Sequence, residues 1–204
     1  MRTLLQIDSS PMGEASISRH LTKEFVQKWR SANFQGRVIS RDLTTIAIPV
    51  VDSAWVKANY TAEDSRTQEE NKILRLSREF TRELLEADEY VMGVPIHNWG
   101  PSASFKLWVD HIVTPFGPKL YKKRATFVIA AGRFYGVDSG NASKNYVEPW
   151  LRTLFGRLGV EDMRFIMADG AVDVRNGKTD LAEFLKPHVG AIQTLFANDF
   201  AFVT

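Results

Sequence analysis

Short runs of β-branched and apolar residues alternate with longer amphipathic stretches along the whole chain. Parallel strands can be joined only by a crossover of a dozen or more residues, usually a helix, so this alternation is typical of a parallel sheet covered by helices. Five such runs predict an α/β fold with a doubly wound, five-stranded parallel sheet, helices on both faces, and ligands beyond the carboxyl ends of the strands. The predicted strands are Thr3–Ile7, Arg37–Ser40, Glu89–Val94, Ala125–Ala131 and Met163–Met167.

The helices expected between and after these strands follow the 3.6-residue period of apolar positions. They are Ser16–Ala32, Asp64–Ala87, Ser102–Ile112, Lys144–Leu158 and Thr179–Ala197. The stretch Asp42–Thr61 shows no clean period, so we expect irregular chain with one short helix. In the long second helix, the side chains expected to face the core are Ile73, Leu74, Phe80, Leu84 and Leu85. No repeat or linker interrupts the chain, which predicts a single domain over residues 1–204.

The composition excludes several classes of protein. With 44% hydrophobic and 25% charged residues and a net charge of +2, the chain has the make-up of an ordinary globular protein. The densest basic cluster, Lys122–Arg124, precedes an apolar strand and fits a solvated strand start better than a nucleic-acid patch. The absence of cysteine excludes thiol chemistry, iron–sulfur clusters and structural zinc of the cysteine type. We find neither a signal peptide nor an apolar run of about 20 residues, and therefore expect a soluble, cytoplasmic protein.

Several catalytic and binding motifs are absent. There is no GxGxxG for a dinucleotide, no GxxxxGK[ST] for a nucleotide phosphate, and no GxSxG for a hydrolase. A phosphoreceiver domain of the same topology requires an aspartate at the end of the third strand, where this chain has Val94 and Pro95. No metal site is predicted, because metal-ligand spacing is lacking among the four histidines His20, His97, His111 and His188.

The loop after the first strand is rich in serine and leads into a helix. Its residues Ser9–Ser18 place hydroxyl groups beside the N-terminus of that helix. Unpaired backbone N–H groups and the positive end of the helix dipole suit a phosphate there. The alternative is helix capping alone, with Ser16 as the N-cap and Ser9 and Ser10 as turn formers.

Two further loops leave the carboxyl ends of predicted strands. Pro95–Pro101 combines two prolines, Gly100, an amide and an aromatic ring, which suits the edge and the face of a flat heteroaromatic ligand. The alternative is a rigid turn in which Trp99 only packs. Ala131–Gly136 joins glycines, aromatics and a cation, and could equally be an ordinary surface loop.

Over nearly its whole length the chain resembles the FMN-dependent NADH:azoreductase family, which is related to the flavodoxin-like NAD(P)H:quinone reductases. The segments that carry the resemblance, in matching order, are Asp8–Leu21, Gly93–Ile112 and Val147–Gly170. The resemblance implies a flavodoxin-like fold, FMN as cofactor and NADH or NADPH as electron donor. It also implies a quinone or azo compound as acceptor, and a homodimer with its active site at the subunit interface.

The resemblance assigns roles to individual residues. The first segment would hold the FMN phosphate through Ser10, Ser16, Ile17 and Ser18. The second, usually P-M-Y-N-F in the family, would cradle the isoalloxazine through Pro95, Ile96, His97, Asn98 and Trp99. The family's third loop usually reads T-S-R-G-G, and this chain keeps a glycine and an arginine in another order, which points to Ala131, Gly132 and Arg133.

The resemblance further implies a ping-pong mechanism. Hydride would pass from the nicotinamide to flavin N5, and the acceptor would then be reduced on the same flavin face. No side chain need act as acid or base, so no residue is predicted to be catalytic. Residues predicted to contact the acceptor are Phe116 in a loop shorter than the family's, Tyr135 in the third loop, and Arg157. Arg157 would either favour anionic acceptors or be simply solvated near the end of its helix.

Two alternatives remain open at this stage. A flavodoxin-type electron carrier would share the cofactor, although such carriers tend to be strongly acidic to steer toward basic partners, and this chain is slightly basic. The helix after the second loop carries an apolar stripe that would either face a second subunit or cover its own sheet. Its members are Phe105, Trp108, Val109 and Ile112.

Overall fold

The computed structural model describes residues 1–201 of the chain, and side chains of residues 1–197. A parallel sheet forms the centre, with strand order β2-β1-β3-β5-β6. This is the doubly wound arrangement predicted by the alternation, and it confirms the α/β, flavodoxin-like fold. The strands are β1 (Thr3–Asp8), β2 (Arg37–Asp42), β3 (Glu89–His97), β5 (Arg124–Ala130) and β6 (Asp162–Ala168).

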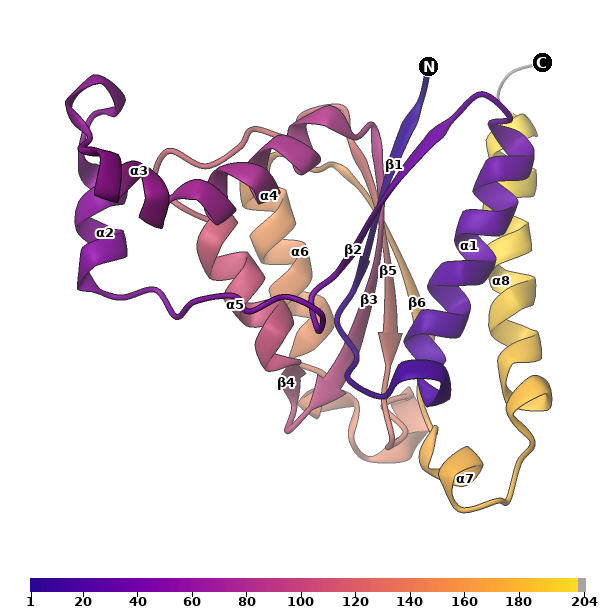
Figure 1. Ribbon diagram of the computed structural model, residues 1–204. Coiled ribbons are helices and arrows are strands. Elements are labelled where there is room, and N and C mark those ends of the chain that lie inside the picture. The colour runs from indigo at the N-terminus through magenta and orange to yellow at the C-terminus, as the bar shows by residue number, and fades with distance from the viewer. Residues whose placement is uncertain (202–204) are drawn as a thin grey trace.

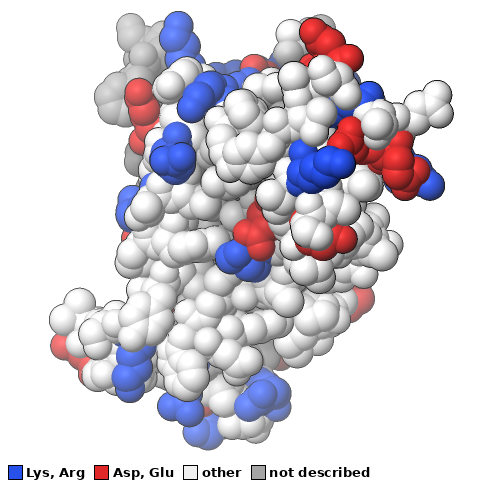
Figure 2. Space-filling model, turned by 90° about the vertical axis from the view of Figure 1, so that its left-hand side faces the viewer, with Lys and Arg blue, Asp and Glu red and all other residues white. Residues whose placement is uncertain are grey.

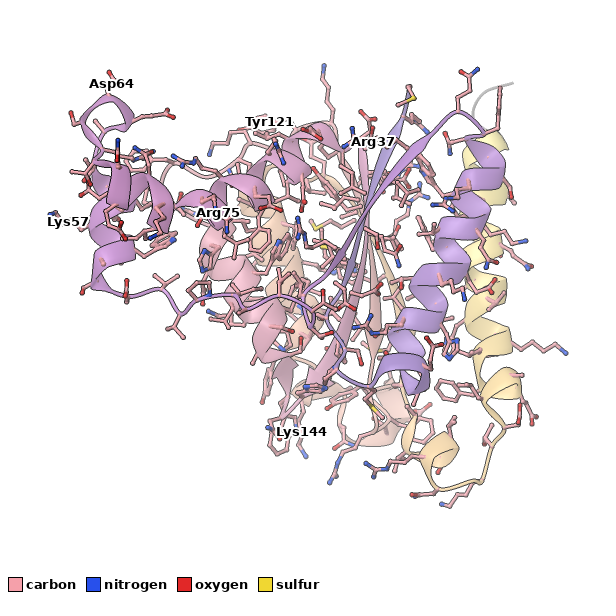
Figure 3. The ribbon with its side chains drawn as sticks, in the orientation of Figure 1. Arg37, Lys57, Asp64, Arg75, Tyr121 and Lys144 are labelled. Carbon is pink, nitrogen blue, oxygen red and sulfur yellow. The ribbon has the colours of Figure 1, made fainter. Side chains whose placement is uncertain are left out.

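Helices cover both faces of the sheet (Figure 1). On one face lie α1 (Ile17–Ala32) and α8 (Leu181–Ala201); on the other lie α4 (Arg75–Glu86), α5 (Ala103–Ile112) and α6 (Val147–Leu158). Two short helices, α2 (Ser53–Tyr60) and α3 (Gln68–Ile73), project beyond the second layer, and Lys57 and Asp64 mark the far end of that projection in Figure 3. Smaller elements are α7 (Val172–Arg175), the two-residue strand β4 (Gly100–Pro101) and the 3₁₀ turns Gly13–Ala15, Glu63–Ser65, Val137–Ser139 and Ala142–Lys144.

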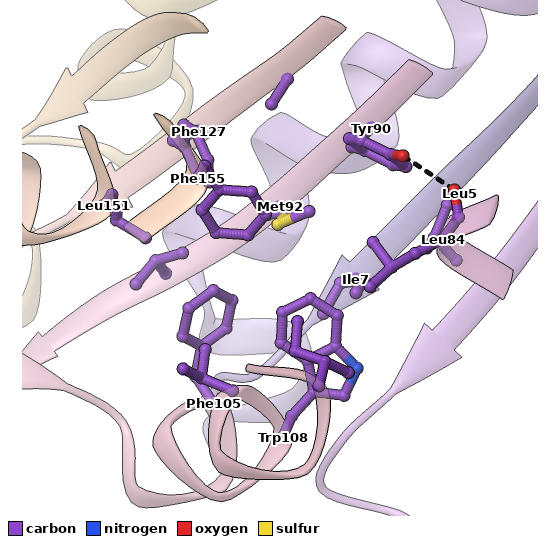
Figure 4. Packing of buried hydrophobic residues seen from close by; sticks show 14 of the residues in the cluster. Leu5, Ile7, Leu84, Tyr90, Met92, Phe105, Trp108, Phe127, Leu151 and Phe155 are labelled. Atoms are coloured by element: carbon purple, nitrogen blue, oxygen red, sulfur yellow. Dashed lines mark hydrogen bonds between the residues drawn. The ribbon is translucent and has the colours of Figure 1, made fainter. Parts of the chain in front are cut away.

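The larger apolar cluster lies between the sheet and the α4–α6 layer (Figure 4). Its strand residues include Ile7, Met92 and Phe127, and the buried Tyr90 donates its hydroxyl to the carbonyl oxygen of Leu84 at 2.7 Å. The apolar stripe of α5 belongs to this cluster, and its four side chains are at most 2% exposed. The stripe therefore covers its own sheet and is not available to a second subunit.

The helix predicted over Asp64–Ala87 is divided. A capping box starts α3, in which the Thr67 hydroxyl accepts from the Glu70 amide while the Glu70 carboxylate accepts from the Thr67 amide. The chain then turns at Leu74, which is buried with Trp55 and Ala58 under the projecting helices. The single long helix was thus a wrong prediction: the Thr67 cap starts α3 at Gln68 rather than at Asp64, and the turn at the buried Leu74 separates α3 from α4.

One core assignment within α4 was also wrong. Leu85 is 48% exposed, whereas Glu83 is buried and ion-paired with Arg41 of β2. A carboxylate can occupy a buried helix position only when it is paired, and the cation that pairs it comes from a distant strand. Ile73 is partly buried against the small cluster beneath α2, while Phe80 and Leu84 lie in the core as expected.

The basic cluster Lys122–Arg124 stands at the start of β5. The Lys123 ammonium donates to the carbonyl oxygens of Leu85 and Ala87 at 3.0 and 2.6 Å, which satisfies the C-terminal end of α4. Arg124 pairs with Asp162 of β6 at 2.6 Å. This fits the strand-start interpretation. No helix in the described part of the chain is both long and apolar enough to cross a membrane.

A buried hydrogen-bond chain attaches α2 to the rest of the molecule. The Trp55 indole donates to Ser77 Oγ at 2.9 Å, Ser77 Oγ lies 2.8 Å from His111 Nδ1, and His111 Nε2 lies 2.8 Å from the Pro49 carbonyl oxygen. An indole N–H only donates and a carbonyl only accepts. With a neutral imidazole, the Ser77 hydroxyl therefore donates to Nδ1, and His111 carries its proton on Nε2.

Replacing Ser77 by alanine should destabilise the protein by about 1–3 kcal/mol, because the Trp55 indole and His111 Nδ1 both lose their buried partner. Urea unfolding followed by circular dichroism measures the change. Ser31→Ala, at an exposed helical serine of α1, is the matched control and should change stability little. Equal stability of both variants would show that the hydrogen bonds linking Trp55, Ser77 and His111 are not formed in solution.

Candidate functional site

The three loops singled out in the sequence meet at one edge of the sheet, because all five parallel strands end there (Figure 1). β1 and β3 are neighbours, with Asp8, the last residue of β1, opposite Gly93 of β3. The Ser9 hydroxyl donates to the Gly93 carbonyl oxygen at 2.8 Å, and the Ser104 hydroxyl donates to the Ser9 carbonyl oxygen at 3.2 Å. These bonds join the first loop to the second strand end and to the first turn of α5.

The first loop ends at the N-terminus of α1. Ser16 is the N-cap, and its hydroxyl accepts from the Arg19 amide at 3.3 Å, as the capping interpretation expected. Its Oγ also lies 3.2 Å from that of Ser18. Within the described residues no acceptor faces the amides of Ile17 and Ser18, as expected for the first turn of a helix. These two amides and two adjacent hydroxyls thus share the positive end of a 16-residue helix.

An ion pair stands directly behind this loop. Arg19, in the first turn of α1, contacts Asp42 at the end of β2 through two nitrogens, at 2.6 and 2.8 Å. The hydrogen bonds from this guanidinium are the main reason why the pKa of Asp42 is lowered to about 2. Neither Arg19 nor Asp42 was predicted from the sequence, in which the basic residue belongs to a helix and the acid starts an irregular stretch.

A buried carboxyl group lies beneath the loop at the end of β1. Asp8 is 7% exposed and accepts hydrogen bonds from the Thr22 hydroxyl at 2.7 Å and the Gln6 side-chain amide at 2.8 Å. Burial raises the pKa of Asp8 above its ordinary value, although both hydrogen bonds act in the opposite direction.

The second loop is shorter than predicted. Pro95, Ile96 and His97 belong to β3, where Pro95 pairs with Ala130, and only Asn98 and Trp99 form the turn to β4. Both turn residues have left-handed backbone, with φ of 49° and 65°. This is the geometry of a two-residue type I′ hairpin, which asparagine tolerates and tryptophan disfavours. The strained turn holds the Trp99 ring 51% exposed at the edge of the sheet.

The third loop is held from behind by the segment after β6. The amides of Gly170, Ala171 and Val172 donate to the carbonyl oxygens of residues 133, 131 and 132, at 3.2, 3.0 and 3.1 Å. The Tyr135 amide donates to Asp169 at 2.6 Å. Ala131 is buried, Arg133 is exposed, and Gly132 has open space where a side chain would stand.

Large apolar side chains are exposed around the three loops. They include Met12 at 56%, Trp99 at 51% and Phe134 at 52%, one from each loop, and Tyr146 at 59% before α6. Beside them, a cleft of about 530 Å³ is lined by residues that include Arg133, Phe134 and Asp169. Apolar side chains exposed together around free amides are typical of a site for a flat, anionic ligand.

Two of the three predicted acceptor contacts lie away from this edge. Phe116 follows the far end of α5 and packs against Tyr60, with ring centroids 6.0 Å apart. Arg157 is exposed in the last turn of α6, near Gly159 and Tyr121, at the edge where the strands begin. In Figure 3 the label Tyr121 marks the edge where the strands begin, and the label Lys144 marks the opposite edge, where the three loops lie. Within this subunit Arg157 lies at the end of the sheet opposite the three loops, because α6 runs antiparallel to the strands, and its role beside the acceptor stays a prediction. Tyr135 alone lies at the site.

Proteins of known function share this sequence pattern. A family model for the flavodoxin-like fold matches residues 2–188. The chain is 61% identical to FMN-dependent NADH:quinone oxidoreductase 3 of Burkholderia lata, over 97% of this chain and 100% of the relative. It is 41% identical to the FMN-dependent NADH:quinone oxidoreductase of Acidobacterium capsulatum, over 92% and 95%.

Solved structures agree in fold. An FMN-dependent NADH-azoreductase from Bacillus anthracis, solved in complex with FMN, superposes with a TM-score of 0.82 at 20% identity, over 97% of this chain and 99% of that one. The fold and the helix N-terminus facing three loops define a flavodoxin-like protein of the flavin-binding type. The chain belongs to the flavodoxin-like family whose members include the FMN-dependent NADH:quinone oxidoreductases.

Two variants of Trp99 test the strained turn. In the flavin-free protein, Trp99→Gly should be more stable than Trp99→Ala by about 1 kcal/mol, because only glycine accepts the left-handed backbone without a steric penalty. Both lack the ring, so the difference in urea unfolding isolates the backbone. If the alanine variant is as stable as the glycine variant, the turn is not left-handed in solution.

Asp8 gives the site a pH dependence. Folding raises the pKa of Asp8, so the folded protein holds this proton more tightly than the unfolded chain does. The resulting stabilisation of the folded state is fully present below the unfolded-state pKa of about 3.9. It is lost as the pH rises through the pKa of Asp8 in the folded protein. Asp8→Asn, which keeps an acceptor for Thr22, should therefore be at least as stable as wild type at pH 7. Its advantage in urea unfolding should shrink as the pH is lowered toward about 4.5. An advantage that grows on acidification would contradict the assignment.

Proposed function

We propose that the protein is an FMN-dependent oxidoreductase that transfers electrons from NADH to quinones and azo compounds. The observation that carries the proposal is the pair of amides at Ile17 and Ser18, unpartnered among the described residues, at the same edge as a strained, exposed Trp99. Unpartnered amides suit the phosphate of a ligand, and an exposed aromatic side chain at the same edge suits its flat ring. The 61% identity with an FMN-dependent NADH:quinone oxidoreductase over nearly the full length of both chains supports the choice of FMN and of acceptor.

The residues present fit FMN. Its phosphate would be held by the amides of Ile17 and Ser18 and the hydroxyls of Ser10, Ser16 and Ser18, without a direct cation. Ser10 and Ser16 are 2% and 3% exposed, so the loop itself holds both residues in place. The isoalloxazine would lie against β3 and its turn, from Pro95 through Ile96, His97 and Asn98 to Trp99, and against Ala131, Gly132 and Arg133.

The chemistry belongs to the cofactor, which when bound takes up a hydride equivalent from a reduced nicotinamide and gives two electrons to the acceptor. The protein supplies position and environment. Aromatic side chains from the loops would exclude water from the face of the bound isoalloxazine. The left-handed turn holds Trp99 in place. The cleft lined by Arg133 and Phe134 is our proposed place for the nicotinamide and then the acceptor. No side chain is required to transfer a proton.

The proposal includes a homodimer. Figure 2 shows the face that carries α2, α4 and α5, with charged side chains spread from its top to its middle, basic ones at its lower end, and a largely uncharged stretch between. The exposed apolar residues of this projecting region are Val50 at 74%, Val56 at 43%, Tyr60 at 63% and Phe116 at 70%. An apolar surface of this kind suits a second copy of the chain. A cytoplasmic location also belongs to the proposal, because the donor NADH is a reductant of the cytoplasm.

The function is tested by separating its two half-reactions under anaerobic conditions. Addition of NADH to the yellow holoprotein should bleach the flavin absorbance, and a quinone or an azo dye added afterwards should restore it. Steady-state NADH oxidation should be rapid only with an acceptor. A flavin that NADH does not reduce would contradict the enzyme and favour an electron carrier reduced by a partner protein.

Ser18→Ala tests the phosphate site. A hydrogen bond to a charged group contributes about 1.5–3 kcal/mol, so FMN binding should weaken roughly ten- to a hundred-fold. Titration with riboflavin, which lacks the phosphate, is the control and should change little. The variant leaves the Ser16 cap in place, so the helix should persist in circular dichroism. Unchanged affinity for FMN would place the phosphate elsewhere.

A further inference from the structure

Arg19 makes contacts that no part of the proposed reaction uses. Besides its two bonds to Asp42, it donates from Nε and Nη2 to the carbonyl oxygen of Ser10, at 2.9 and 2.7 Å. Nη2 also donates to the Thr44 hydroxyl at 3.0 Å, and that hydroxyl donates to Asp42 at 2.8 Å. One guanidinium thus connects the phosphate loop, the first turn of α1 and the chain that follows β2.

The two hydrogen bonds from Arg19 set the direction in which the Ser10 carbonyl oxygen points. A carbonyl oxygen facing a phosphate would repel it, whereas this oxygen accepts hydrogen bonds from two N–H groups of Arg19. The planar guanidinium fork is rigid, so the bidentate contact with Asp42 fixes the direction in which its other edge points. Asp42 is itself oriented by the Thr44 amide at 2.9 Å.

We propose that Arg19 and Asp42 form a clamp that positions the Ser10 carbonyl, and through it the loop, for the phosphate of FMN. This inference rests on the proposed function, since it deepens the account of the same site. Arg19 is a positioning residue: its charge is matched by Asp42, and its described donors are directed at the Ser10 carbonyl oxygen, Asp42 and Thr44.

The competing explanation is that Arg19 acts as a cation that attracts the phosphate through space. The two explanations predict opposite changes in FMN affinity for one variant. Asp42→Asn loses the charged partner that orients the guanidinium, so the clamp predicts weaker FMN binding. An attracting cation freed from its counter-ion would bind FMN more tightly.

The experiment compares dissociation constants for FMN and riboflavin in full-length wild type, Arg19→Lys, Asp42→Asn and the control Arg30→Lys, by quenching of flavin fluorescence. Lysine keeps the charge and loses the fork. Arg30 is an exposed arginine near the other end of the same helix. We expect Arg19→Lys to weaken FMN at least ten-fold and riboflavin less than three-fold, Asp42→Asn to weaken FMN several-fold, and the control to change neither.

An unchanged ratio of FMN to riboflavin affinity in Arg19→Lys overturns the clamp, whether both ligands weaken together or neither does. Tighter FMN binding by Asp42→Asn also overturns it. If Arg19→Lys fails to fold, the direction of the change in FMN affinity of Asp42→Asn alone decides between the clamp and the attracting cation. Wild-type protein that does not prefer FMN to riboflavin would instead contradict the proposed function, so the two failures are distinguishable.

Discussion

The parallel pairing of β1 with β3 is the constraint on which the site depends. Because both strands run in one direction with Asp8 opposite Gly93, their following loops leave the sheet side by side. Ser9 fixes that relation with a hydrogen bond to the Gly93 carbonyl oxygen. Parallel strands also require crossover helices, and the first of these places its N-terminus at the same edge. Phosphate site and ring site are thus consequences of a single pairing.

Much of this arrangement could be predicted from the sequence, because it is written in local patterns. Alternating apolar runs indicated the five strands, and the Ser9–Ser18 loop before an amphipathic helix indicated an anion site. The Thr67–Glu70 capping box is equally local, and the start of α3 at Gln68 could have been predicted from it. That start was therefore within reach of the sequence and was missed, whereas the turn at Leu74 accompanies its burial against Trp55 and Ala58.

Other features depend on partners that are distant in the chain. The Arg19–Asp42 contact joins residues 23 positions apart, and Glu83 is buried only because Arg41 arrives from β2. The left-handed Trp99 contradicts the preference of its residue type, so propensity alone would exclude it. A motif match could not show that Arg157 lies at the end of the sheet opposite the three loops, because it says which residues correspond and not which end of a helix faces a site. Tertiary packing determines all of these features, and no short window of sequence contains them.

The central claim is that one flavin spans the three loops, with its phosphate at α1 and its ring at β3 and β5. Amide chemical shifts in the labelled full-length protein test it most directly, by comparing FMN with riboflavin. The account predicts that FMN shifts the amides of Ile17, Ser18, Trp99 and Gly132, whereas riboflavin shifts those of Trp99 and Gly132 and leaves Ile17 and Ser18 near their flavin-free positions. Equal shifts at Ile17 and Ser18 with both ligands, or shifts confined to the opposite edge near Tyr121, would contradict it.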